Sequence, residues 1–149
     1  MNDTVGTASQ PPVLLTEEAP ETRRQRRALL VTGPNPARRP GDALDYLIAY
    51  EACLDAAGAV LRLSYAPGKL ILVPDALEGY IATLNPALPA EALAHVVLGD
   101  INDELVPRWV QIVIERPAKG PSGLRQRVLV EDREPHWDDP ALLARAPRL

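Results

Sequence analysis

The sequence predicts an α+β domain in which two antiparallel strand pairs flank two consecutive helices. Apolar residues alternate with period two in two early segments, which is typical of strands, and two later segments carry apolar residues at helical spacing. A second pair of strand-like segments follows these helices. The chain has 149 residues, of which 46% are hydrophobic and none is Phe, so we expect one domain with an aliphatic core.

The first strand pair is predicted between residues 44 and 73. The alternation runs from Leu44 to Cys53 and places four residues on one face: Tyr46, Ile48, Tyr50 and Ala52. Ala56-Ala57-Gly58 is short enough to turn the chain into a second strand at Val60–Tyr65. Leu70–Val73 is expected to extend this hairpin beyond the Pro67-Gly68 turn.

Two helices are predicted next. Pro74 is placed to open the first, which is expected to bury Ala76, Leu77, Tyr80, Ile81 and Leu84. Asn85-Pro86 ends that helix and Pro89 opens the second. The apolar stripe of the second helix consists of Leu93, Val97, Ile101 and Leu105.

The last strand pair is predicted at Trp109–Glu115 and Leu124–Glu131, joined by a loop from Pro117 to Gly123. The resulting β-β-α-α-β-β order predicts a four-stranded antiparallel sheet with both helices on one face. Such a sheet has open edges and a second face that is partly apolar, so we expect it to associate with partners.

The segments outside this unit are predicted to be tails. Residues 1–32 are polar and without periodicity, which predicts a disordered N-terminal tail; the domain spans 33–134, and a second tail spans 135–149. The tail contains Arg23–Arg27, either a phosphate- or nucleic-acid-binding arm or a solvated charge run. The net charge of −4 argues against nucleic acid as a partner of the whole chain.

Composition also bears on location. The single cysteine suits a reducing compartment, and no run approaches the roughly 20 apolar residues that span a bilayer. We therefore expect a soluble cytoplasmic protein without a membrane partner.

The order of four short sequence motifs along the chain resembles that in one enzyme family. They are Pro34-Asn35-Pro36, Asp45-Tyr46, Ser64-Tyr65-Ala66-Pro67 and Pro107-Arg108-Trp109. Over roughly residues 33–132 the chain resembles the NADPH-dependent 7-cyano-7-deazaguanine reductases of queuosine synthesis, a tRNA modification pathway. These enzymes have the tunnelling fold, so the resemblance implies a homo-oligomeric ring with active sites between subunits.

The resemblance implies nitrile chemistry at Cys53. In the family a cysteine thiolate attacks the nitrile carbon to form a thioimide, which NADPH reduces to the amine, while a carboxylic acid protonates the nitrogen. Cys53 stands near the family nucleophile, and Asp55 is the nearby acid if the strand continues far enough for both to share a face. The alternative is that Cys53 is a small buried hydrophobe.

The NADPH motif of the family is altered. The family has two lysines at the start of the first helix, where this chain has Asp75 and Glu78, and only the aromatic position is kept, by Tyr80. Acids beside a polyanion reverse the sign of the local Coulomb energy. NADPH is therefore implied by resemblance alone, and Asp75 also fits the ordinary role of an acid at a helix start.

The substrate motif is altered as well, with Glu91 and His95 as its candidate survivors. Glu91 lies near the family Glu that clamps the purine edge, and His95 could replace the lost His. The alternatives are a first-turn acid and a surface i,i+4 pair. One Cys and two His, His95 and His136, are too few for a zinc site of the kind seen in cyclohydrolases of this fold.

Two functions follow as expectations. The first is conversion of 7-cyano-7-deazaguanine to 7-aminomethyl-7-deazaguanine through a Cys53 thioimide. The second is a non-reducing tunnelling-fold protein that binds a purine-like ligand or serves as an assembly subunit.

Overall fold

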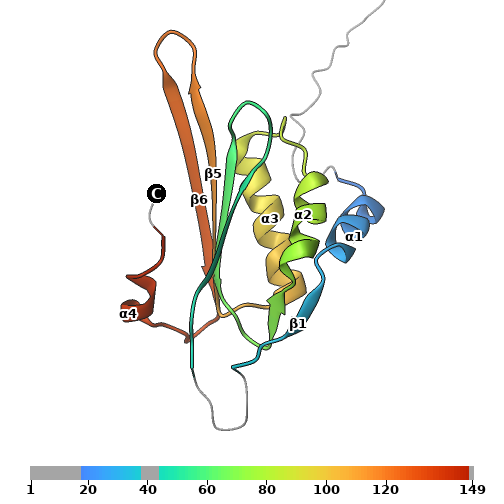
Figure 1. Ribbon diagram of the computed structural model, residues 1–149, viewed down its shortest axis with the longest axis vertical. Helices are drawn as coiled ribbons and strands as arrows, with labels where there is room; N and C mark the ends of the chain where they lie inside the picture. Colours follow the sequence, from blue (N-terminus) through green and yellow to red (C-terminus); the bar gives the residue numbers. More distant parts are fainter. Residues whose placement is uncertain (1–17, 38–43, 148–149) are drawn as a thin grey trace, which may run out of the picture.

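The structure, a computed structural model, describes residues 18–37 and 44–147 and is centred on a four-stranded antiparallel sheet (Figure 1). The strand order is β2-β3-β5-β6, with bounds β2 Ile48–Cys53, β3 Val60–Ala66, β5 Trp109–Lys119 and β6 Leu124–Arg133. Helices α2 (Pro74–Ala82) and α3 (Ala90–Leu105) lie on one face of this sheet. The predicted α+β class and the order of these elements are confirmed.

A separate two-stranded sheet joins β1 (Thr32–Pro34) to β4 (Leu70–Leu72). The sequence predicted that residues 70–73 would extend the first hairpin. This prediction is wrong, because β4 pairs with another strand. β1 supplies that partner, because the antiparallel register sets Thr32 opposite Leu72. The Leu72 N–H also donates to the Tyr65 hydroxyl at 2.9 Å, which ties the small sheet to β3.

The core lies between the four-stranded sheet and the helices. Alternate residues of β3 and β5 face the helices in register, as Leu61 opposite Ile114, Leu63 opposite Ile112 and Tyr65 opposite Val110. The predicted stripe of the second helix is buried against them: Leu93, Val97, Ile101 and Leu105. Removal of these apolar side chains from water is the main stabilising contribution to this packing.

Several strand boundaries differ from those predicted. β2 begins at Ile48 instead of residue 44, β5 ends at Lys119 instead of Glu115, and β6 ends at Arg133 instead of Glu131. The loop predicted over 117–123 is therefore a short turn between two long strands. A register irregularity between Arg116 and Lys119 accommodates Pro117, which has no N–H to donate to a sheet.

The face of the four-stranded sheet away from α2 and α3, here called the open face, carries the other alternate residues. They include Arg62 of β3, Glu115 of β5 and Arg127 of β6. The C-terminal segment with the short helix α4 (Pro140–Leu143) lies on the side of β6 away from the other helices (Figure 1). Among the described helices none is long and apolar enough to cross a membrane.

The N-terminal segment departs most from its prediction. Residues 20–28 form helix α1 (Pro20–Ala28), which lies beside α2 and α3 (Figure 1), where the sequence predicted a disordered tail. Its Arg26 is buried, with 8% of its surface exposed. Residues 1–17 of the predicted tail lie outside the described residues.

A buried carboxylate explains why α1 docks. Asp100 of α3 accepts from Arg26 Nε at 2.6 Å and Nη2 at 3.0 Å, from Arg27 Nε at 2.9 Å, and from the Tyr80 hydroxyl at 2.6 Å. Glu18 also accepts from Arg26. Neither interpretation of the arginine run, a ligand-binding arm or a solvated charge run, holds for these two arginines, because both are ion-paired within the fold.

Candidate functional site

Cys53 is the last residue of β2, and its side chain is exposed. Cys53 pairs with Val60 of β3, and alternation along β2 places it on the open face with Glu51. The interpretation of Cys53 as a small buried hydrophobe is therefore wrong. An exposed thiol at this position is accessible to a small molecule.

Asp55 lies in the turn after β2, not on the strand. Its Oδ1 accepts from the backbone N–H groups of Ala57 at 3.0 Å, Gly58 at 3.1 Å and Ala59 at 3.0 Å. The strand ends at Cys53, so the condition for Cys53 and Asp55 to share a strand face is not met. In this structure the Asp55 carboxylate organises the β2–β3 turn.

Glu91 and His95 lie together in the first turns of α3, and both are exposed. Glu91 Oε2 accepts from Gln126 Nε2 at 3.2 Å, and His95 Nδ1 contacts the Glu91 backbone oxygen at 2.8 Å. These residues belong to the helix side of the sheet, whereas Cys53 points to the open face. Within one chain the expected site residues therefore form two separate groups.

The positions that correspond to the family cofactor lysines are also described. Asp75 and Glu78 are exposed on α2. Tyr80, the aromatic residue kept from that motif, is fully buried and donates to Asp100. Burial raises the pKa of the Tyr80 hydroxyl far above its usual value. In this chain the aromatic position serves the core, and the described α2 surface offers acids where a phosphate would need cations.

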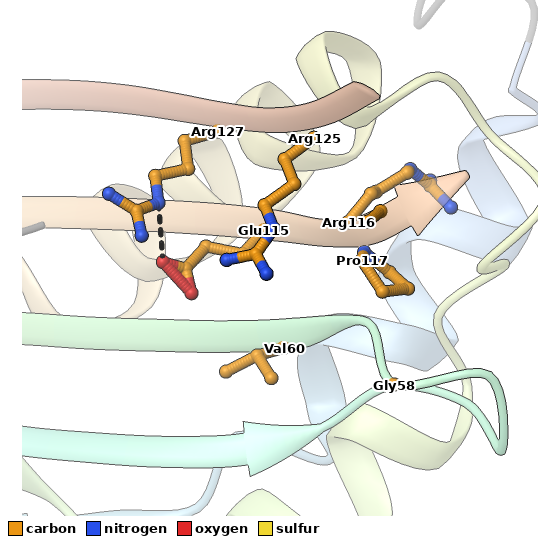
Figure 2. Close-up of a pocket in the computed structure, with 8 residues that line it drawn as sticks. Gly58, Val60, Glu115, Arg116, Pro117, Arg125 and Arg127 are labelled. Carbon is orange, nitrogen blue, oxygen red and sulfur yellow. Dashed lines mark ion pairs between the residues drawn. The ribbon is translucent and has the colours of Figure 1, made fainter. Parts of the chain in front are cut away.

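A cavity of about 270 Å³ opens on the open face, between the β2–β3 turn and the β5–β6 hairpin (Figure 2). Its lining residues are Gly58, Val60, Glu115, Arg116, Pro117, Ala118, Arg125 and Arg127. Cys53 does not line the cavity, but its cross-strand partner Val60 does. Directly opposed side chains on one face have Cβ atoms about 5 Å apart.

Local backbone features shape this cavity. Gly58 has a φ of 104°, which side-chain-bearing residues rarely adopt, and a Cβ placed there would meet Pro117 Cγ at 3.7 Å. The irregularity after Arg116 sets Pro117 and Ala118 against this turn. The turn and the hairpin thus form two walls of the cavity.

Charged side chains form the floor of the cavity. Glu115 Oε1 pairs with Arg127 Nε at 3.0 Å and with Arg62 Nη1 at 2.7 Å. The hydrogen bond to Glu115 raises the pKa of Arg62 above its usual value. Figure 2 shows that Arg125 and Arg127 both extend from β6 toward Glu115. These three cavity residues were not singled out from the sequence, although alternation in 124–131 places the two arginines on one face.

The sequence motifs that carry the family resemblance lie together at the end of the sheet away from this cavity. Asn35 Nδ2 donates to the Gly68 carbonyl at 2.7 Å, and Asn35 Oδ1 accepts from the Tyr46 hydroxyl at 2.6 Å. Asp45 lies 3.4 Å from Arg108 Nε and accepts from Trp137 Nε1 at 3.2 Å. Residues separated by more than 60 positions thus fix the chain entering β2 to the start of β5.

No group of three or more His, Cys, Asp and Glu residues in the described part of the chain could hold a metal ion. Comparison with protein families found no matching family, and comparison with curated proteins found no match.

Proposed function

We propose that this chain is a subunit of a homo-oligomeric ring of the tunnelling-fold type, which binds a purine-like ligand and does not reduce it. The observation that carries the proposal is a four-stranded sheet with helices on one face and, among the described residues, two end strands, β2 and β6, that each pair with one neighbour only. Unpaired strand edges are templates for further pairing.

The charges of the two edge strands support head-to-tail pairing. On the open face β2 presents Glu51, whose side chain is 60% exposed, and no basic residue. On the same face β6 presents three arginines, Arg125, Arg127 and Arg133, and one acid, Glu131, so this strand keeps an excess of positive charge. Pairing of β2 with β6 of the next copy sets opposite charges together, and a head-to-tail interface closes into a ring when its rotation permits.

The division of the expected site residues supports a ligand site between subunits. Glu91 and His95 lie on the helix side, and Cys53 lies at an edge strand, so one chain does not assemble them. A neighbouring copy that pairs at the β2 edge brings a second set of side chains to Cys53, and those of its open face share the side of the sheet on which Cys53 lies. The exposed acids Asp75 and Glu78 argue against NADPH, which enters only through the resemblance.

The assembly is tested by light scattering at high micromolar concentration. We expect an oligomer, which Glu51→Lys dissociates because it places like charges at the β2–β6 interface. Glu78→Lys changes the charge equally on the exposed surface of α2 and is the matched control. A monomeric wild-type protein contradicts the ring.

A second candidate is covalent nitrile binding, which the exposed Cys53 thiol beside a cavity favours. The thiolate sulfur adds to the nitrile carbon, one C–N π bond breaks, and the nitrogen takes a proton. A thioimide forms in this way without an oxidant or a reductant. Intact-protein mass spectrometry with 7-cyano-7-deazaguanine tests it. We expect an adduct that Cys53→Ala abolishes, and an unmodified wild-type protein contradicts this chemistry.

The same ligand tests the non-covalent proposal. We expect 7-cyano-7-deazaguanine to raise the Tm of the wild type and of Cys53→Ala. It should not raise the Tm of Glu91→Ala, because the Glu91 carboxylate is the expected hydrogen-bond acceptor for the purine edge. A Tm rise that Glu91→Ala leaves unchanged contradicts a role for Glu91.

A further inference from the structure

The cavity of Figure 2 contains more cationic than anionic groups. Arg116, Arg125 and Arg127 line it, against the single carboxylate of Glu115. Glu115 is itself shared between Arg127 and Arg62, which lies on the neighbouring strand β3. The carboxylate is therefore already paired with two guanidinium groups, and the cavity keeps an excess of positive charge.

The hydrogen-bond donors of the arginines identify which of them remain available. Arg116 Nη2 donates to the Leu88 carbonyl, and in Figure 2 its side chain points away from the other two. Arg127 uses Nε on Glu115, and its Nη groups have no hydrogen bond to a described residue. The Arg125 guanidinium has no ion pair or hydrogen bond with any residue in 18–37 or 44–147. Each guanidinium carries five N–H donors in a planar fork, so most of the donors of this pair are unused.

The walls of the cavity are apolar. Val60 comes from β3, and Pro117 and Ala118 come from β5 at the register irregularity. A guanidinium fork matches the two oxygens of a carboxylate or phosphate, and hydrogen bonds between charged partners are the strong ones. An oxyanion beside a small apolar group fits this combination of walls and donors.

We propose that this cavity, here called the arginine pocket, binds the oxyanion group of a small ligand. Arg125 and Arg127 donate hydrogen bonds to the oxyanion. The apolar body of the ligand packs against Val60, Pro117 and Ala118. The site is complete in one chain and goes beyond the proposed function, since it needs neither the ring nor a purine. It also lies apart from α2, where Asp75 and Glu78 occupy the positions of the family lysines.

Isothermal titration with inorganic pyrophosphate, inorganic phosphate and succinate, at constant ionic strength, tests the pocket and distinguishes phosphate from carboxylate ligands. We expect the wild type to bind at least one probe and Arg125→Gln to weaken that binding about tenfold or more. Arg125→Lys, which keeps the charge without the fork, should fall between them. Arg133→Gln is the matched control, because Arg133 is an exposed arginine farther along β6 that pairs with Glu131 and Asp138.

Two results overturn the proposal. One is the absence of binding of all three probes at millimolar concentration to the folded wild type. The other is an equal loss of binding in Arg125→Gln and Arg133→Gln, which indicates a general effect of net charge. Circular dichroism of each variant verifies its fold, and Arg125 is exposed on β6, so its replacement should leave the core intact.

Discussion

Two clusters of arginines around a carboxylate lie on opposite sides of the four-stranded sheet, and they differ in burial. On the helix side Asp100 is 1% exposed and holds Arg26 and Arg27. On the open face the Glu115 side chain is 18% exposed and holds Arg62 and Arg127, which are 28% and 50% exposed. Both carboxylates are shared by two guanidinium groups, but the Glu115 cluster is far more open to water.

The two clusters also differ in how completely their hydrogen bonds are satisfied. Asp100 accepts hydrogen bonds from Tyr80 as well as from both arginines. Its side chain lies where α1 packs against α3 and has almost no contact with solvent. A buried charge must be paired in this way, since desolvation without partners is very costly. Around Glu115, in contrast, Arg125 and much of Arg127 keep unused donors. Complete pairing with burial indicates a structural role, and unused donors beside a cavity indicate a binding role.

The largest expected effect is that of Asp100→Asn. Removal of the carboxylate charge leaves the buried Arg26 with Glu18 as its anionic partner, so we expect the cost to approach the roughly 3–5 kcal/mol typical of a broken buried ion pair. Urea unfolding followed by circular dichroism measures it. Asp103→Asn on the same helix is the control: Asp103 pairs with Arg27 at 2.7 Å but is 55% exposed, so its loss should cost about 1 kcal/mol or less. Equal losses in the two variants would contradict the importance of burial.

A smaller effect is expected for Tyr80→Phe, which removes one donor to Asp100 and leaves the arginines in place. We expect a loss of about 1–2 kcal/mol near neutral pH. The pKa of Tyr80 is raised, chiefly by burial, so the folded state holds this proton more tightly than the unfolded state. The stability it provides is full below the ordinary tyrosine pKa of about 10 and falls as the pH rises above it.

Unfolding measurements at neutral pH and above pH 10 check this sign. Tyr80→Phe should lose less stability than the wild type over that interval. Part of the loss should remain, because burial also raises the pKa of Tyr65 to about 12. An alkaline loss identical in both proteins would show that Tyr80 does not contribute.

The elements that sequence predicted well are those with one dominant local signal. The stripe from Leu93 to Leu105 repeats at helical spacing and is buried as predicted. Pro74 begins α2, and alternate residues of β3 face the core as their period-two pattern predicted. In these segments local propensity and burial favour the same structure.

The prediction of the N-terminal segment was wrong because its partner lies far away in sequence. Arg26 and Asp100 are 74 positions apart, and an arginine-rich helix with few apolar residues has no local sign of burial. The same holds for β1, which exists only because β4 pairs with it. Asp55 could have been interpreted as a turn residue from the following Ala-Ala-Gly, since Asp often accepts from backbone N–H groups two residues on.

The arginine pocket could not be predicted for a different reason: it depends on a strand irregularity. Alternation places Arg125 and Arg127 on one face, but the approach of Pro117 to Gly58 follows from the positive φ of Gly58 and the register shift after Arg116. The predicted loop over 117–123 gave no reason to expect Pro117 against Gly58.

The smallest expected effect on stability, and the sharpest test of the comparison, is that of Glu115→Gln. Its charge is partly solvated, and its partners Arg62 and Arg127 are 28% and 50% exposed, so the free energy of unfolding should change by about 1 kcal/mol or less. Pyrophosphate binding should become tighter, because the substitution removes the one carboxylate that competes for Arg127. A unit charge at about 4 Å in water contributes on the order of 1 kcal/mol, which corresponds to an affinity gain of about fivefold. Denaturation and titration of the same preparation measure both quantities. A destabilisation as large as that of Asp100→Asn would make the Glu115 cluster structural, and burial would then no longer separate the two sides of the sheet.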